Sequence, residues 1–166
     1  MAIPQVMLQM NRFDLRPGEM RLDTSVTFDA QLTFIGKIES PWTLQNCPKN
    51  LHAARETGHS GALVIAPAFR PALDGITPGA PLVLLYWMSE APRDLLRQFP
   101  RHRDSATGTF NLRSPARPNP IGMGVVRVTG IDIAAGRVEI DAIDAIDGTP
   151  LIDIKPLARR ADSLPD

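Results

Sequence analysis

Apolar and polar residues alternate along several short segments of the chain, with the period expected of β-strands. The segment Ala30 to Glu39 alternates in this way, and Gly61 to Ala66 is a short apolar run. The run Pro81 to Met88 is continuously apolar, which predicts a strand that is buried on both faces. Two more strands are expected, from Ile121 to Thr129 and from Arg137 to about Ile146.

Turn residues and short helical segments separate these strands. Residues 147–150 read DGTP, a strong turn signal, and they lead into a last strand at residues 151–155. A short helix is expected over Cys47 to Thr57, with Gly58 as its stop, and Pro92 to Gln98 is expected to form one or two helical turns. Many short strands and few helices predict a mainly antiparallel barrel or sandwich. Because no strand–helix alternation, G-x-G-x-x-G motif or P-loop is present, a Rossmann methyltransferase and a nucleotide kinase are excluded.

Composition adds a bias towards arginine. The 166 residues suit one domain, and the 16 prolines argue against long helices. The formal net charge of +0 argues against a non-specific nucleic-acid coat protein, but it leaves room for a local basic face. Of the 18 basic residues, 15 are arginine, which is the better residue for bidentate contacts to phosphate or carboxylate.

The sequence predicts a cytoplasmic protein that has neither a metal site nor a membrane anchor. Its single cysteine, Cys47, allows no internal disulfide, which fits a reducing compartment. The first 20 residues do not have the pattern of a signal peptide, and no apolar run approaches the roughly 20 residues that span a bilayer. No Cys/His cluster has the spacing of metal ligands.

A stiff polar loop is expected at residues 110–122, FNLRSPARPNPIG. Its prolines hold the backbone extended, so that Arg113, Arg117 and Asn119 would project together. Two guanidinium groups and an amide on a stiff loop would bind a polar ligand with little loss of entropy. The alternative is a rigid connector whose arginines form ordinary salt bridges.

A second polar segment lies at residues 140–156, IDAIDAIDGTPLIDIKP. In a strand over Arg137 to Ile146, Asp144 would interrupt an apolar face, and its carboxylate would need a buried cation or a ligand as partner. The alternative is a β-bulge that turns Asp144 towards solvent. Asp153 and Lys155 share one face of the last strand, and a plain ion pair between them is expected.

Taken together, these segments resemble a known family. Residues 113–122 read RSPARPNPIG, residues 144–156 read DAIDGTPLIDIKP, and the earlier residues 35–42 read IGKIESPW. In this order they resemble the signature of the TrmO (TsaA-like) family of S-adenosylmethionine-dependent tRNA methyltransferases. The similarity covers roughly residues 32–157.

The resemblance implies a single compact antiparallel β-barrel with one or two short helices, an N-terminal extension at 1–25, a barrel domain at 26–158 and a tail at 159–166. It also implies a homodimer that binds S-adenosylmethionine and methylates the N6 atom of threonylcarbamoyl-adenosine at position 37 of tRNA. Asp144 is the candidate general base, although a structural role or a hydrogen bond to the ligand is the stronger alternative for it. The cofactor-binding residues carried over from the family are Arg113, Ser114, Arg117, Asn119, Ile121, Asp144, Asp147, Gly148, Thr149 and Pro150.

The chain also departs from the family pattern. Gly79 and Pro81 stand where the family usually has a Phe and a His, and Ser89 stands where it has a second His. Two alternatives therefore stay open: a methyltransferase with another acceptor, or a regulatory module that binds the cofactor without turnover. Bacterial members often carry a further C-terminal domain, without which the barrel would have to hold tRNA alone. For that contact we expect an arginine-rich face, with a solvated surface or a subunit contact as its alternative. Its candidate residues are Arg97, Arg101 and Arg103.

Overall fold

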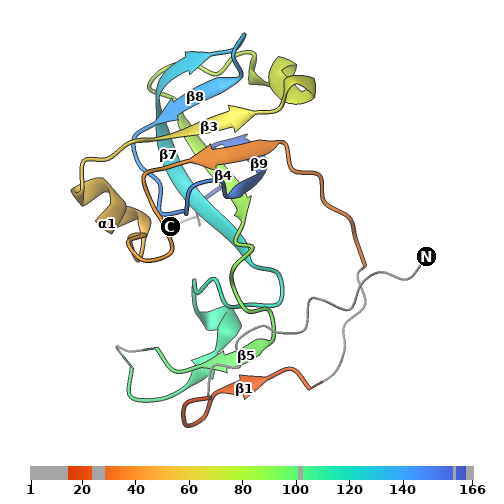
Figure 1. Ribbon diagram of the computed structural model, residues 1–166, viewed down its shortest axis with the longest axis vertical. Helices are drawn as coiled ribbons and strands as arrows, with labels where there is room; N and C mark the ends of the chain where they lie inside the picture. Colours follow the sequence, from red (N-terminus) through yellow and green to blue (C-terminus); the bar gives the residue numbers. More distant parts are fainter. Residues whose placement is uncertain (1–14, 24–28, 101–102, 159, 164–166) are drawn as a thin grey trace. The chain divides into compact units, whose positions relative to one another are not determined.

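The structure is a computed structural model that describes residues 15–23, 29–100, 103–158 and 160–163 (Figure 1). The chain divides into two units. One contains residues 29–89 and 121–166, and the other contains residues 1–28 and 90–120. The β1–β5–β6 sheet belongs to the second unit, and all strands of the barrel belong to the first. Residues 90–120 thus leave the barrel after one strand and return to it at the next.

The first unit is a closed antiparallel barrel, which confirms the predicted architecture (Figure 1). Its strands follow the order β2-β3-β8-β7-β4-β9. Pairing of Gly36 in β2 with Leu151 in β9 closes the ring. Closure leaves the barrel without a free edge strand. Its strands are β2 (Gly36–Glu39), β3 (Gly61–Ile65), β4 (Pro81–Trp87), β7 (Ile121–Asp132), β8 (Arg137–Ile140) and β9 (Pro150–Pro156).

The barrel core is built from the inward residues of these strands. In β4 the side chains alternate, with Leu82, Leu84 and Tyr86 buried and the outward residues between them half-buried. The prediction that this run is buried on both faces was therefore wrong for its outer face. The expected strands at Ala30 to Glu39 and at Arg137 to Ile146 are shorter than predicted, because only their parts within β2 and β8 have ladder partners.

A glycine in β7 makes room for an aromatic ring of β4. Gly122 pairs with Tyr86, and a Cβ at residue 122 would lie 2.1 Å from Cε2 of that ring. Two residues further on, a Cβ at Gly124 would make only ordinary contacts of 3.7–3.8 Å. The tyrosine ring therefore packs inside the barrel only because residue 122 has no side chain.

Short helices connect the barrel strands. The expected helix at Cys47 to Thr57 is confirmed as α1 (Leu51–Glu56), which begins later because Asn50 caps it by accepting a hydrogen bond from the Ala53 N–H (2.8 Å). Gly58 follows its end with a φ of 72°, as expected for a helix stop. A 3₁₀-helix, η1 (Pro67–Leu73), precedes β4.

The second unit contains a three-stranded sheet in the order β1-β5-β6. Its elements are β1 (Met20–Arg21), β5 (Leu95–Gln98), β6 (Thr107–Gly108) and the 3₁₀-helix η2 (Thr109–Asn111). The prediction of helical turns at Pro92 to Gln98 was wrong, since residues 95–98 pair with both neighbours as a strand. Ladder hydrogen bonds to distant segments outweigh the local preference of so short a stretch.

Candidate functional site

The DGTP segment forms a tight turn between residues 146 and 149. The Ile146 carbonyl accepts hydrogen bonds from the Thr149 N–H (3.1 Å) and from the Thr149 hydroxyl (2.6 Å). Gly148 occupies the third position of the turn with a φ of 79°, a conformation that side chains disfavour. Pro150 then begins β9, so the motif is a stiff corner at the end of a barrel strand.

The end of β2 holds this corner in place. The Asp147 carboxylate accepts a hydrogen bond from the Ser40 N–H (3.1 Å), and the Asp147 N–H donates to the Trp42 carbonyl (2.9 Å). The Gly148 N–H donates to the Ile38 carbonyl at 2.9 Å. Residues about 105 positions apart are thereby joined, and the IESP segment and the DGTP segment form one site.

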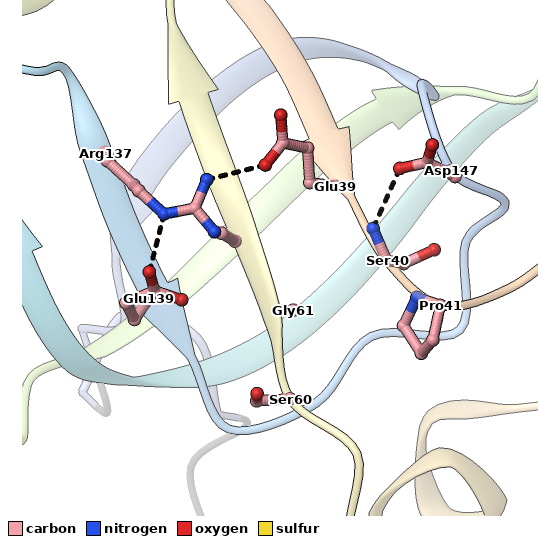
Figure 2. A pocket seen from close by; sticks show the side chains of 9 residues that line it. Glu39, Ser40, Pro41, Ser60, Gly61, Arg137, Glu139 and Asp147 are labelled. Atoms are coloured by element: carbon pink, nitrogen blue, oxygen red, sulfur yellow. Dashed lines mark hydrogen bonds and ion pairs between the residues drawn. The ribbon is translucent and has the colours of Figure 1, made fainter.

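An open hollow of about 360 Å³ lies beside this corner (Figure 2). Three carboxylates and one guanidinium line it, so its charge is negative. The lining residues are Glu39, Ser40, Pro41, Ser60, Gly61, Ala62, Arg137, Glu139 and Asp147.

Arg137 joins two glutamates in the wall of the hollow through ion pairs. Its guanidinium lies over β3 and contacts Glu39 on one side and Glu139 on the other, at 2.6 Å each (Figure 2). The hydrogen bond from Arg137 lowers the pKa of Glu39, and the same bond raises the pKa of Arg137. Ala62 lies between both glutamates in the ladder and is 1% exposed. The three charged side chains therefore lie around a small, buried residue of β3.

Asp144 lies in the loop after β8, because that strand ends at Ile140. The expected alternation through residue 144 is therefore wrong, and residues of both parities, such as Ala142 and Ile143, are buried there. Asp144 is half-buried, and its Oδ1 accepts a hydrogen bond from the Tyr86 hydroxyl (3.2 Å). Its partner in the structure is thus a hydroxyl, and not the buried cation or ligand that was predicted. Burial and the Asp144 charge raise the pKa of the nearby Cys47 thiol, which keeps it protonated.

The RSPARPNP segment folds back on itself in the second unit. The Arg117 guanidinium donates to three backbone carbonyls, those of Ser114 (3.0 Å), Thr109 (3.2 Å) and Leu112. Arg113 and Asn119 are exposed, whereas Arg117 is half-buried. The prediction that the three side chains project together was wrong for Arg117, because unpaired loop carbonyls offer it nearer partners.

A buried pair of polar residues holds this loop by hydrogen bonds, and no sequence pattern indicated it. The Gln98 side-chain amide donates to the Thr109 hydroxyl (2.9 Å) and to the Ala116 carbonyl (2.5 Å). The Thr109 hydroxyl donates in turn to the Leu95 carbonyl at 2.8 Å. Gln98 and Thr109 are the two buried polar residues of the described chain, at 8% and 2% exposure. Both read as ordinary polar positions in the sequence.

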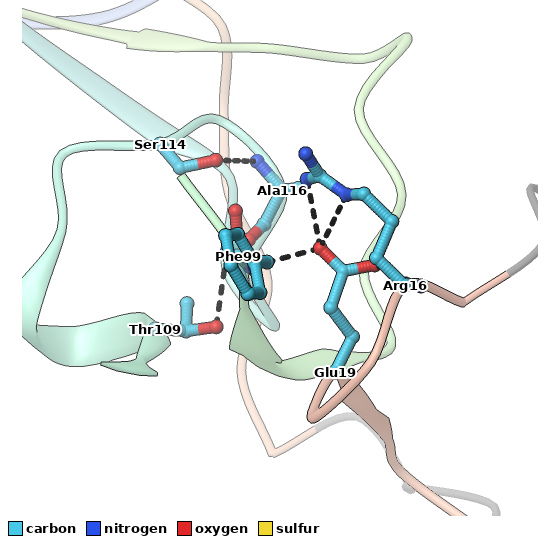
Figure 3. A network of polar contacts seen from close by, with 7 residues as sticks. Arg16, Glu19, Phe99, Thr109, Ser114 and Ala116 are labelled. Atoms are coloured by element: carbon cyan, nitrogen blue, oxygen red, sulfur yellow. Dashed lines mark hydrogen bonds and ion pairs between the residues drawn. The ribbon is translucent and has the colours of Figure 1, made fainter. Parts of the chain in front are cut away.

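Glu19 joins residues 15–23 to β5 (Figure 3). Its Oε1 accepts hydrogen bonds from the Phe99 N–H (2.9 Å) and from Arg16 (2.8 Å), and its side chain is 7% exposed. Burial acts to raise the pKa of Glu19, but the bonds from Phe99 and Arg16 outweigh it and lower the pKa. Glu19 thus anchors the N-terminal segment as a carboxylate.

The predicted cofactor residues fall into both units. The barrel unit carries Ile121, Asp144, Asp147, Gly148, Thr149 and Pro150. The second unit carries Arg113, Ser114, Arg117 and Asn119. In the barrel unit, Asp147 lines the hollow, and Asp144 contacts Tyr86 instead.

Of the predicted nucleic-acid contacts, Arg97 and Arg103 are exposed, and Arg101 lies outside the described residues. The predicted ion pair is confirmed, with 2.6 Å between Lys155 Nζ and Asp153 Oδ2. Sequence reasoning missed Ser40, Tyr86, Gln98 and Thr109, whose roles depend on partners far away in the chain.

At Gly79, where the chain departs from the family pattern, the backbone is left-handed. Gly79 has a φ of 89°, its N–H donates to the Val128 carbonyl (2.8 Å), and its carbonyl accepts from Arg127 (2.8 Å). An aromatic residue at this position would be strained in such a conformation. Among the described residues, no helix is long and apolar enough to cross a membrane, and no group of three acidic, His or Cys side chains is placed to hold a metal ion.

Comparison with known proteins points to one family. The chain is 36% identical over 148 residues to the "Probable S-adenosyl-L-methionine-binding protein VirR" of Rhizobium radiobacter, covering 89% of this chain and 82% of that protein. It is 37% identical over 131 residues to an S-adenosyl-L-methionine-binding protein of Archaeoglobus fulgidus, covering 77% and 89%. A crystal structure of TrmO from Pseudomonas aeruginosa matches with a TM-score of 0.64 and 29% identity, over 84% of this chain and 60% of that one.

The matched part is thus about three fifths of the solved TrmO chain. The family model of the tRNA-methyltransferase O N-terminal domain matches residues 37–163, which include every barrel strand except the first residue of β2. With this match, the relatives of similar length and the six-stranded barrel agreeing, the chain belongs to the family of the tRNA-methyltransferase O N-terminal domain.

Proposed function

We propose that this protein binds S-adenosylmethionine and transfers its methyl group to the N6 atom of threonylcarbamoyl-adenosine at position 37 of tRNA. The observation that carries the proposal is the corner at Asp147 to Pro150, where the family motif is held rigid by β2 beside a negatively charged hollow. Curated relatives are named for binding S-adenosyl-L-methionine, and the solved relatives are named TrmO. The proposal includes a cytoplasmic location.

The residues of the barrel fit a ligand that carries positive charge. S-Adenosylmethionine supplies a sulfonium-activated methyl group when it is bound. The carboxylates of Asp144 and Asp147 offer negative charge and hydrogen-bond acceptors to its cationic and hydroxyl groups. Because the Tyr86 hydroxyl and the Ser40 N–H already orient these carboxylates, they lose little freedom when a ligand binds.

The residues of the RSPARPNP loop would act in two ways. Arg113 and Asn119 are exposed and suited to direct contact with a carboxylate or phosphate. Arg117 and Ser114 brace the loop from within, so they act as positioning residues. Asp144 would orient the acceptor amine or accept its proton.

Titration calorimetry of the ligand-stripped protein with S-adenosylmethionine tests the first step. We expect saturable binding at about one ligand per chain, and Asp147→Asn to weaken it more than Asp153→Asn, a matched change in the ion pair with Lys155. Absence of binding at millimolar ligand refutes the proposal. Mass spectrometry of tRNA carrying threonylcarbamoyl-adenosine, incubated with protein and cofactor, then tests the acceptor.

A different methyl acceptor is the second candidate function. The left-handed backbone at Gly79 favours it, because this conformation suits glycine and disfavours the aromatic residue that is usual in the family. Labelled methyl transfer to cell-extract fractions, but not to the modified tRNA, would support this candidate. Cofactor binding with no transfer to any fraction would leave a regulatory module.

A homodimer is part of the proposal as well. Sedimentation of the purified protein across a range of concentrations tests it directly. A species of twice the chain mass, 18.1 kDa per chain, is expected. A monomer at all concentrations contradicts it.

A further inference from the structure

Phe110 is the most exposed large hydrophobic residue of the described chain. It is 85% exposed, whereas Leu44 follows at 69% and the other exposed large hydrophobics do not exceed 50%. A phenylalanine left in water gives up the stabilisation that its burial would contribute. A single exposed apolar side chain is common on protein surfaces, so its support and its charged neighbours must show whether it contacts another molecule.

The backbone that presents this ring is held on both sides. Thr109, directly before it, is 2% exposed and fixed by its hydrogen bonds to Gln98 and Leu95. The Thr109 carbonyl accepts from the Leu112 N–H (3.1 Å) and from Arg117 (3.2 Å). The ring therefore stands on a fixed support and does not lie on a free loop. Binding through it would cost little backbone entropy.

Two arginines lie close to Phe110 along the backbone of its own unit. Arg97 pairs across the ladder with Gly108, two residues before Phe110, and Arg113 follows three residues after it. Both arginines are exposed, as is Arg103. In the part of the chain that the structure describes, neither Arg97 nor Arg103 forms an ion pair with a carboxylate, and Arg97 contacts only the Ala106 carbonyl through its side chain.

We propose that Phe110 is a stacking platform for an unpaired base of an RNA loop, with Arg97 and Arg113 contacting the adjacent phosphates. Proteins that bind single-stranded RNA combine exposed aromatic rings with arginines. The rings can stack on any unpaired base, since every base offers a face for stacking. A duplex keeps its bases stacked on one another and offers the ring no face. This inference rests on the proposed action on tRNA, and it names the part of the RNA that is held.

Binding to two synthetic RNAs tests the platform without any turnover. One is an anticodon stem-loop with an open loop, and the other is a fully paired duplex of the same length. Phe110→Ala and Phe110→Leu should each weaken stem-loop binding at least about fivefold, because the stacking face is lost, whereas Phe110→Trp should retain it. Duplex binding should stay unchanged in all three variants. Leu44→Ala, which removes an exposed leucine of the barrel unit, is the matched control.

Two further readouts separate the platform from other roles of the ring. Calorimetry with S-adenosylmethionine and sedimentation should give the same affinity and the same mass for Phe110→Ala as for the wild type. If Phe110→Ala changes the oligomeric state, loses the cofactor or binds the stem-loop as well as the wild type does, the platform is refuted. Stem-loop binding that depends on Phe110 supports the platform even where the modified tRNA is not methylated, a result that would refute only the proposed acceptor.

Discussion

Replacing Gly122 by alanine should destabilise the barrel by forcing one aromatic ring to move. The added Cβ would lie 2.1 Å from Cε2 of Tyr86 and 2.5 Å from both Cδ2 and Cζ, far inside van der Waals contact. Tyr86 is 4% exposed, so its ring has no open space to enter. Moving it would also break the hydrogen bond from its hydroxyl to Asp144.

The magnitude follows from two costs and one gain in the free energy of unfolding. Overpacking of a core costs about 1–3 kcal/mol, and losing a hydrogen bond to a charged group adds about 1.5–3 kcal/mol. Replacing a glycine recovers about 0.4–1 kcal/mol through the unfolded chain. We therefore expect the free energy of unfolding to fall by about 1.5–5.5 kcal/mol. For a chain of this size, that corresponds to a Tm lower by roughly 3–22 °C.

Gly124→Ala is the matched control in the same strand. Its Cβ would meet the nearest atoms at 3.7–3.8 Å, so we expect a stability equal to or slightly above that of the wild type. Urea denaturation followed by circular dichroism measures both variants. A Tyr86→Leu background should reduce the cost of Gly122→Ala, since the ring is then absent. Equal stability of the Gly122 and Gly124 variants would refute the reasoning.

Three further predictions concern the second unit. Gln98→Leu should lower the free energy of unfolding by about 1–3 kcal/mol, since the buried Thr109 hydroxyl and a loop carbonyl lose their donor, and thermal unfolding measures this. Arg117→Lys should weaken S-adenosylmethionine binding in calorimetry nearly as much as Arg117→Ala, because an ammonium group cannot reach the three carbonyls that the guanidinium joins; full affinity in both variants would remove this residue from the site. Because the folded-state pKa of Glu19 is lowered, its contribution to stability is present above the usual glutamate pKa of about 4.3 and is lost as the pH falls through the folded value. Glu19→Gln should therefore flatten the acid limb of a stability-against-pH curve, and an unchanged limb would contradict this.

Local signals predicted the barrel well. The strands predicted at β2, β3 and β7 and the Asp147-Gly148 turn each depend on a few neighbouring residues, and the structure confirms them. The limits of the strands were less predictable. Ala30 to Ile35 alternates as a strand should, yet only the residues from Gly36 have ladder partners.

The candidate site was likewise predictable only in part. The motifs identified the family and the segments, because the order of residues along the chain is enough for a resemblance. The contacts of Asp144 and Arg117 were not predictable, since each depends on atoms brought near by folding, the Tyr86 hydroxyl in one case and loop carbonyls in the other. A side chain bonds to the donors and acceptors that folding brings near it, and the spacing of residues along the sequence does not reveal them.

The sequence by itself thus determined a β-rich chain, its main turns and its family, all of which are written in local patterns and motif order. Only the tertiary structure decided that residues 95–98 form a strand, that residues 90–120 join the N-terminal segment in a second unit, and that Gln98 and Thr109 are buried together. The physical reason is that these features arise from hydrogen bonds between distant segments. Their free energy outweighs weak local preferences, and it exists only once the chain has folded.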